Sequence, residues 1–427
     1  MRPVLYHVNG ADLFCIQTDR FKSEHFSLRL VLPLTAEHAQ ENSLITSVLG
    51  RGTEQHPSKL LINRCLDDLY STGISARNQR LGDMQCIGFG ADFLGARYTG
   101  GGTGILPRVL DMLTELCYRP QRKNGELLPE HVENEKENLR DGIRAAINNP
   151  RGYAMSKCRK LLCAGEPFAL SLIGEEETLG NITAASMTAR HRAVFEGAAP
   201  VLFYVGATAP ETVAALVADR FPQFQAPQHP YSTVVRTWED TPRVGEEEMP
   251  LCQGKLSIGF RTDVAIGHPL APATLLLNEI FGGSPASKLF LNVREKRSLC
   301  YHCSSSLDLY KGVLFANAGM TPQNRAVTEE AMLEEFDALA RGRISNEEFE
   351  AAHRSLAHSY RQVYDNPGAL ASFYAGRAIA GSADSIESFR DAVARVTKAQ
   401  VVEAAARMKK GATFFLKGTL TEEDDDE

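Results

Sequence analysis

The chain has 427 residues, of which 43% are hydrophobic, and a formal net charge of -7, which together suit two or three domains with substantial cores. It carries no basic stripe with interleaved aromatic residues, so we expect no nucleic-acid partner. It opens without a basic region followed by an apolar run and has no apolar stretch of membrane-spanning length, which predicts a cytoplasmic protein with no membrane partner.

The predicted elements follow the same order in each half of the chain. The first half gives a strand at 26–34, a helix, strands within 75–97, helices at 106–117 and 129–147, an Asn149-Pro150 break, another helix, and a strand at 201–205. The second half gives a strand at 256–260, a helix at 269–281, strands within 300–318, helices at 329–339 and 346–364, an Asn366-Pro367 break, a helix, and a strand at 414–416. Few residues are identical, so the repeat is one of pattern.

This repeat predicts an α+β fold with two similar domains, each an antiparallel sheet packed by helices, arranged as two halves of a clamshell. We place the first domain at residues 1–221, a linker at 222–250, the second domain at 251–420 and a solvated acidic tail at 421–427. The linker is rich in proline and acidic residues, and we expect one short strand within it at 233–238.

Three motifs that can carry chemistry lack the rest of a site. The glycine-rich segment 100–104 has no lysine and hydroxyl pair to hold phosphate and magnesium, so we expect a flexible turn. Glu350 and His353 have the spacing of a carboxylate-bridged metal site but no further carboxylates, which favours a surface contact. Cys300 and Cys303 are expected on opposite faces of a strand, and the odd total of nine cysteines predicts buried free thiols in a reducing compartment.

The segment 281–301 holds a more specific candidate. A helix is expected to end near Phe281, Gly282 and Gly283 allow a tight turn, and a second helix leads back to a strand near residue 299. Arg294 then lies at a helix end and Tyr301 at a strand start, from which both side chains could reach the space between the domains. On spacing alone, an exposed arginine and a half-buried tyrosine remain the simpler interpretation.

This segment resembles the carboxy-terminal domain signature of the insulinase/pitrilysin family of zinc peptidases and their non-catalytic relatives. In that family a glycine-rich turn leads to Ser-x-Leu-Phe and then to an Arg-Glu-Lys-x-x-Leu-x-Tyr run. The matching residues here are Ser287-Lys288-Leu289-Phe290 and the run from Arg294 to Tyr301. The two-fold repeat is similar to the duplicated α+β domains of the same family, so the resemblance covers nearly the whole chain.

The resemblance also says where a zinc site would lie. Active members carry His-x-x-Glu-His on a helix just before a Gly-Thr pair, with a further glutamate ligand from a downstream helix. Counted back from Gly52-Thr53, the ligand and base positions hold Ser43, Thr46 and Ser47, and the downstream ligand position holds Gly142. Hydroxyl groups are poor zinc ligands at neutral pH, so we expect neither a metal nor any other cofactor in this chain.

A displaced copy of the motif, His38 to Asn42, has the first histidine and the glutamate but ends in asparagine. It also lies five residues too far from Gly52. Because an amide cannot replace imidazole at zinc, we expect no zinc site there.

The resemblance implies the non-catalytic subunit of a heterodimeric, two-component zinc metallopeptidase that cleaves small peptides or unfolded segments. The partner would be a zinc-bearing subunit of the same family, and this chain alone would be inactive. Arg294 and Tyr301 would assist catalysis by holding a substrate carbonyl or the developing oxyanion. The substrate-binding residues would be Gly282, Gly283 and Ser284, together with Ser75 and Ala76 on an edge strand to which a peptide adds.

Two other classes of function remain open at this point. A purely structural homologue would need no substrate, and measurable peptide binding would separate it from a substrate-binding subunit. A stand-alone peptide-binding protein would bind peptides as a stable monomer with no partner.

Overall fold

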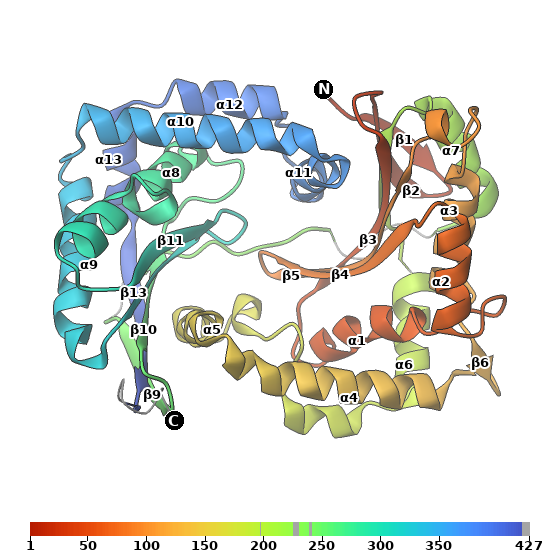
Figure 1. The fold of residues 1–427 in the computed structure, drawn as a ribbon, viewed down its shortest axis with the longest axis horizontal. Helices are drawn as coiled ribbons and strands as arrows, with labels where there is room; N and C mark the ends of the chain where they lie inside the picture. The colour runs from red at the N-terminus through yellow and green to blue at the C-terminus, as the bar shows by residue number, and fades with distance from the viewer. Residues whose placement is uncertain (197, 225–229, 239–240, 421–427) are drawn as a thin grey trace. The chain divides into compact units, whose positions relative to one another are not determined.

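The fold is described from a computed structural model that covers residues 1–196, 198–224, 230–238 and 241–420 (Figure 1). The chain forms two compact units. The first unit comprises 1–144, 170–232 and 362–385; the second comprises 145–169, 233–361 and the chain from 386 onward. Segment 145–169 of the first half of the sequence therefore belongs to the second unit, and segment 362–385 of the second half belongs to the first unit. The predicted acidic tail at 421–427 lies outside the described residues.

The first unit is built on a six-stranded sheet with the order β1-β2-β8-β3-β5-β4. Its strands are β1 (Val4–Val8), β2 (Ala11–Gln17), β3 (Ser23–Pro33), β4 (Gly73–Leu81), β5 (Met84–Leu94) and β8 (Val201–Gly206), beside a ribbon of β6 (Arg122–Lys123) and β7 (Glu126–Leu127). The pairing of β2 with β8 is parallel and the other pairings are antiparallel, so the sheet is mixed where a purely antiparallel one was expected. Strand β4 is an edge strand of this sheet, and its neighbour in the sheet is β5.

Helices of the first unit cover this sheet. They are α1 (Ala39–Leu49), α2 (Lys59–Asp68), α3 (Leu106–Tyr118), α4 (Pro129–Ala145), α6 (Ala184–His191), α7 (Pro210–Arg220) and α11 (Pro367–Ile379), with short helices η1 (Ala96–Tyr98), η4 (Glu176–Asn181), η5 (Arg192–Glu196) and η9 (Val363–Asp365). Phe26, Leu28 and Leu30 alternate along β3 and pack in one core with Ile45 of α1 and Leu110 of α3. This alternation of apolar residues sets the face on which α1 and α3 pack, and the polar residues between these apolar ones, Ser27 and Arg29, are buried on the other face.

The second unit repeats the plan with a five-stranded sheet of order β11-β12-β10-β13-β9. Its strands are β9 (Arg243–Met249), β10 (Gly254–Arg261), β11 (His302–Asp308), β12 (Val313–Met320) and β13 (Lys409–Gly418). The strand expected at 233–238 is absent, because β9 is the strand of this region. It pairs in parallel with β13, as β2 pairs with β8 in the first unit. The expected linker therefore contains the second unit's own first strand.

Helices of the second unit are α5 (Pro150–Leu162), α8 (Ala271–Asn278), α9 (Arg325–Ala340), α10 (Asn346–Gln362), α12 (Ile386–Ala394) and α13 (Lys398–Arg407), with short helices η2 (Ala146–Asn148), η3 (Pro167–Ala169), η6 (Glu279–Gly283), η7 (Leu289–Lys296) and η8 (Pro322–Asn324). Within the described ranges, none of the helices of either unit combines the length and the apolar character needed to cross a membrane.

Two helices are exchanged between the halves of the sequence. Helix α5 comes from the first half and packs on the sheet of the second unit, and α11 comes from the second half and packs on the sheet of the first unit. Helix α5 contacts β10 and β13, and α11 contacts β3 and β8 (Figure 1). The side chains of Asn149 and Asn366 cap these helices by accepting hydrogen bonds from Gly152 N (3.1 Å) and Ala369 N (2.9 Å). A proline follows each cap at the first helical position, where its missing N–H costs nothing. The two Asn-Pro breaks thus mark the starts of the exchanged helices.

Candidate functional site

The positions of the degenerate zinc motif lie on helices α1 and α4 of the first unit. Thr46 is buried, and the Ser43 hydroxyl accepts a hydrogen bond from Asn78 Nδ2 of the edge strand β4 at 2.8 Å. Gly142 of α4 is exposed, and a Cβ added there would meet nothing within 4 Å. These positions offer the hydroxyl groups of serine and threonine and a glycine without a side chain. Zinc requires imidazole and carboxylate ligands, which are missing there.

An arginine occupies this region instead. Arg51, just beyond α1, donates from Nε to the carboxylate of Glu135 on α4. Both side chains line a cavity of about 240 Å³ together with Thr46, Ser47 and Ala76. The Arg51 guanidinium next to Glu135 supplies a positive charge without coordination chemistry. Among the residues that the structure describes, no group of three or more His, Cys, Asp and Glu side chains could hold a metal ion.

The residues of the displaced motif at His38 do not gather at one site either. His38 Nδ1 lies 3.1 Å from a Glu41 carboxylate oxygen. Asn42 is buried elsewhere, donating to Gln85 Oε1 at 2.9 Å and accepting from Arg190 Nε at 2.7 Å. The third position therefore belongs to a buried polar network rather than to a site with His38.

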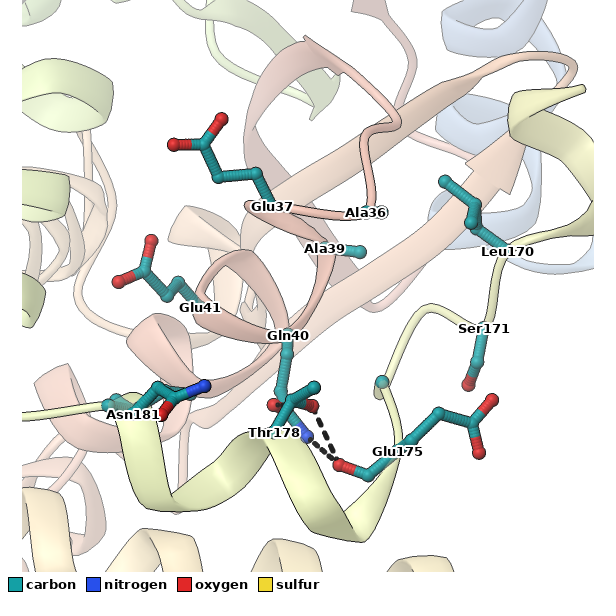
Figure 2. A pocket seen from close by; sticks show the side chains of 12 residues that line it. Ala36, Glu37, Ala39, Gln40, Glu41, Leu170, Ser171, Glu175, Thr178 and Asn181 are labelled. Carbon is teal, nitrogen blue, oxygen red and sulfur yellow. Dashed lines mark hydrogen bonds between the residues drawn. The ribbon is translucent and has the colours of Figure 1, made fainter.

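A cavity of about 450 Å³ opens beside the start of α1 (Figure 2). Its central polar groups bond to one another: Gln40 Nε2 donates to the Glu175 carbonyl at 2.9 Å, and the Thr178 hydroxyl donates to Gln40 Oε1 at 2.7 Å. The carboxylates of Glu37 and Glu41 lie on one side of these groups and that of Glu175 on the other (Figure 2). The acidic groups do not converge on one point, so this cavity offers no built ligand site.

The structure brings Arg294 and Tyr301 together in the second unit. Both line one cavity of about 390 Å³, with Ser298, Thr321 and other residues between η7 and η8. Tyr301 is 52% exposed, and its backbone N–H donates to the Gly319 carbonyl of β12 at 2.8 Å. The two side chains therefore line the same cavity, and their role toward a substrate stays a prediction.

Packing against its own helix holds Arg294 in place. Its guanidinium carbon lies 4.7 Å from the centroid of the Phe290 ring, one turn earlier in η7, and Nη1 lies 3.5 Å from Glu295. Residues 289–296 form a π-helix, with Leu289 and Val293 buried in the core. Stacking of this kind orders a long side chain while leaving its donors available to a ligand.

The paired glycines have a structural role that the sequence did not reveal. A Cβ at Gly282 would lie 2.5 Å from the Ser305 backbone nitrogen, so the helix end can approach β11 closely only with glycine there. A Cβ at Gly283 would lie 2.6 Å from Asn278 Nδ2. The Ser284 hydroxyl donates to the Glu279 carbonyl at 3.2 Å, which closes the turn. Gly282 is buried against the protein itself, whereas Gly283 is exposed.

Ser75 and Ala76 are exposed on β4, the edge strand of the first sheet. Strand β4 pairs only with β5 among the described strands. An edge strand presents main-chain donors and acceptors that an extended peptide can use.

Cys300 and Cys303 require a correction. The strand begins only at His302, so Cys300 lies in the turn before it and the two thiols are not on opposite faces. The thiols hydrogen-bond to each other, which lowers the pKa of Cys300 and raises that of Cys303. The argument from strand alternation was wrong because the regular strand was expected to start earlier. None of the nine cysteines, all of which lie in the described part of the chain, forms a disulfide.

A basic cluster beside Tyr301 was missed by the sequence reasoning. Burial, together with the positive charges of Arg151, Lys255 and Arg294, lowers the pKa of His302 to about 4. His302 is therefore neutral at neutral pH. No motif signals this cluster, because Arg151 comes from the exchanged helix α5 and is far from the other residues in sequence.

Comparisons with known proteins agree with this architecture. Residues 181–356 match the family model described as the Peptidase M16 inactive domain. The chain is 27% identical over 413 residues to the "Probable inactive metalloprotease YmfF" of Bacillus subtilis, with 96% of each chain covered.

Two solved structures share the fold over nearly the full length. A conserved protein from Enterococcus faecalis superposes with a TM-score of 0.87 at 24% identity, covering 98% of this chain and 99% of that one. A peptidase M16 inactive domain from Pseudomonas fluorescens superposes with a TM-score of 0.77 at 19% identity, covering 99% of both chains. Together with the degenerate zinc positions and the Arg294–Tyr301 segment, these comparisons show that the chain is similar over nearly its whole length to a probable inactive metalloprotease and, over residues 181–356, to the Peptidase M16 inactive domain.

Proposed function

We propose that this chain is the substrate-binding, non-catalytic subunit of a heterodimeric zinc peptidase whose other subunit carries the metal. The observation that carries the proposal is the shared cavity of Arg294 and Tyr301, two polar side chains that project from rigid elements. A structural homologue would have no need of such donors at a surface cavity.

Each of these side chains has a distinct role in the proposed complex. The Arg294 guanidinium, ordered by its stack on Phe290, donates charge-assisted hydrogen bonds to a substrate carbonyl and to the oxyanion that forms during attack. The Tyr301 hydroxyl donates to the same region. Zinc and the activated water belong to the partner, because this chain has hydroxyl groups and a glycine where the ligands would be.

The substrate class follows from the edge strand. An extended peptide adds to β4 beside Ser75 and Ala76 through main-chain hydrogen bonds, which select conformation rather than sequence. Small peptides and unfolded segments can adopt this conformation, and folded proteins cannot. We therefore propose short or unfolded polypeptides as the substrates.

The purified chain is expected to contain no stoichiometric zinc and to cleave no peptide alone. Its ligand positions are Ser43, Ser47 and Gly142, and the nearby Arg51 already compensates the charge of Glu135. Metal analysis of the chain, before and after incubation with zinc and removal of excess metal, measures this directly. About one zinc per chain that disappears in His38→Ala would contradict the proposal and point to the displaced motif.

A further inference from the structure

The basic cluster lies on the sheet face that α5 partly covers. His302 of β11 and Lys255 of β10 both pair with Gly319 of β12, so the three residues form one row across the sheet. Side chains of one row point to the same face, and two strand spacings separate Lys255 from His302 by about 10 Å. The residue between them has no side chain, which leaves a notch in the row.

Lys255 leans over this notch. A Cβ at Gly319 would lie 3.2 Å from Lys255 Nζ, so the ammonium group lies on the β12 side of its own strand, in the direction of His302. Gln253 holds it there by accepting a hydrogen bond from Nζ at 2.8 Å.

Arg151 approaches the same face from the start of α5. Its Nη2 donates to the Ser304 hydroxyl at 2.8 Å, and that oxygen lies 3.3 Å from His302 Nε2. Among the residues that the structure describes, neither Arg151 nor Lys255 forms an ion pair with a carboxylate. Arg294 borders the cluster, and its one charged partner within the described ranges is the exposed carboxylate of Glu295, at 3.5 Å.

Cations gathered without carboxylates repel one another unless an anion joins them. Burial is the main cause of the lowered pKa of His302, and the positive charges of Arg151, Lys255 and Arg294 lower it further because they disfavour a fourth charge. A neutral imidazole and two hydrogen-bond donors around a notch suit a planar anion with oxygen acceptors.

We propose that Arg151, Lys255 and the neutral His302 form a subsite for a carboxylate of the bound peptide, next to Arg294 and Tyr301. This inference rests on the proposed function and adds a preference for acidic groups to it. The carboxylate is supplied either by the carboxy terminus of the peptide or by an aspartate or glutamate side chain. In both cases the recognition is charge-assisted hydrogen bonding from Arg151 and Lys255.

Fluorescence polarisation with the full chain and a labelled unstructured peptide tests the subsite. The peptide is made with a free carboxy terminus, with an amidated one, and with its single internal glutamate changed to glutamine. Loss of the recognised carboxylate is expected to weaken binding by about tenfold, as for a typical charge-assisted hydrogen bond. The double variant Arg151→Gln/Lys255→Gln is expected to bind all forms equally, while Lys255→Arg retains the preference.

Arg354→Gln is the matched control, because it removes one positive charge from an exposed side chain of the second unit on α10. It is expected to leave the preference unchanged. Sensitivity to amidation assigns the carboxylate to the peptide terminus, and sensitivity to the glutamine change assigns it to a side chain. Peptide binding that ignores both changes overturns the subsite and leaves the proposed function standing. No peptide binding at all contradicts both.

Discussion

Replacing Arg294 with alanine is expected to lower peptide turnover by the reconstituted heterodimer by ~10²–10³-fold, while folding and subunit association stay intact. The size of the effect follows from losing one preorganised donor at a developing oxyanion. The guanidinium is exposed and stacks on Phe290, so its removal leaves no buried group without a partner. Steady-state kinetics of the purified pair, with circular dichroism and size-exclusion chromatography of the variant, provide the measurement.

Two further variants sharpen this prediction. Tyr301→Phe removes only the hydroxyl group, and a smaller loss of turnover is expected because a neutral donor stabilises charge less than a guanidinium does. Lys296→Ala is the control, since Lys296 is exposed in the same segment and its ammonium group donates a hydrogen bond to Asn292 Oδ1 at 2.9 Å. Unchanged turnover in both Arg294→Ala and Tyr301→Phe would rule out an assisting site and favour a structural role.

Replacing Glu166 with alanine is expected to destabilise the second unit by about 3–5 kcal/mol, the usual effect of removing one partner from a buried ion pair. Glu166 follows the exchanged helix α5, and its carboxylate bonds to Arg261 of β10 and to Lys311 Nζ, the latter at 2.7 Å. All three side chains are buried. The substitution leaves two cations without their carboxylate, and chemical denaturation followed by circular dichroism measures the loss.

The matched control is Arg407→Ala, which breaks the largely exposed pair with Asp263 (nitrogen–oxygen distance 3.1 Å) and leaves Asp263 unchanged, since its φ of 55° disfavours alanine. Exposed pairs of this kind contribute about 0–1 kcal/mol, so little change in unfolding free energy is expected. Equal, small effects of the two substitutions would mean that the ion pairs of Glu166 with Arg261 and Lys311 do not stabilise the second unit.

The two-fold repeat could be predicted from the sequence because it depends on local signals, whereas Arg294 and Tyr301 were singled out only by the family resemblance of the segment 281–301. Apolar residues at every second position indicate a strand, and apolar residues at helical spacing indicate a helix. Both signals are the same whichever unit the element belongs to. The pattern Ser345-x-x-Glu348 is a further local signal, typical of a capping box, and Glu348 N donates to the Ser345 hydroxyl at 3.1 Å. The similar pattern Thr208-x-x-Glu211 does not form a capping box, because the N-cap residue of α7 is Ala209, which makes no side-chain cap.

The exchange of α5 and α11 could not be predicted from those signals. Each helix has an apolar face that fits a sheet, and nothing in the Asn149-Pro150 or Asn366-Pro367 segments says which sheet receives it. The parallel strands β2 and β9 were missed for a similar reason, since strand pairing is non-local. The basic cluster depends on the exchange, because it needs Arg151 beside the row of Lys255 and His302.

The most direct test of the central claim is cleavage of a fluorogenic peptide by this chain, by a zinc-bearing insulinase-family subunit from the same genome, and by their equimolar mixture. If the proposed heterodimer exists, neither chain alone has appreciable activity, and the mixture cleaves the peptide with zinc bound only in the partner. Full activity of the zinc-bearing chain alone, unchanged by adding this chain, would contradict it.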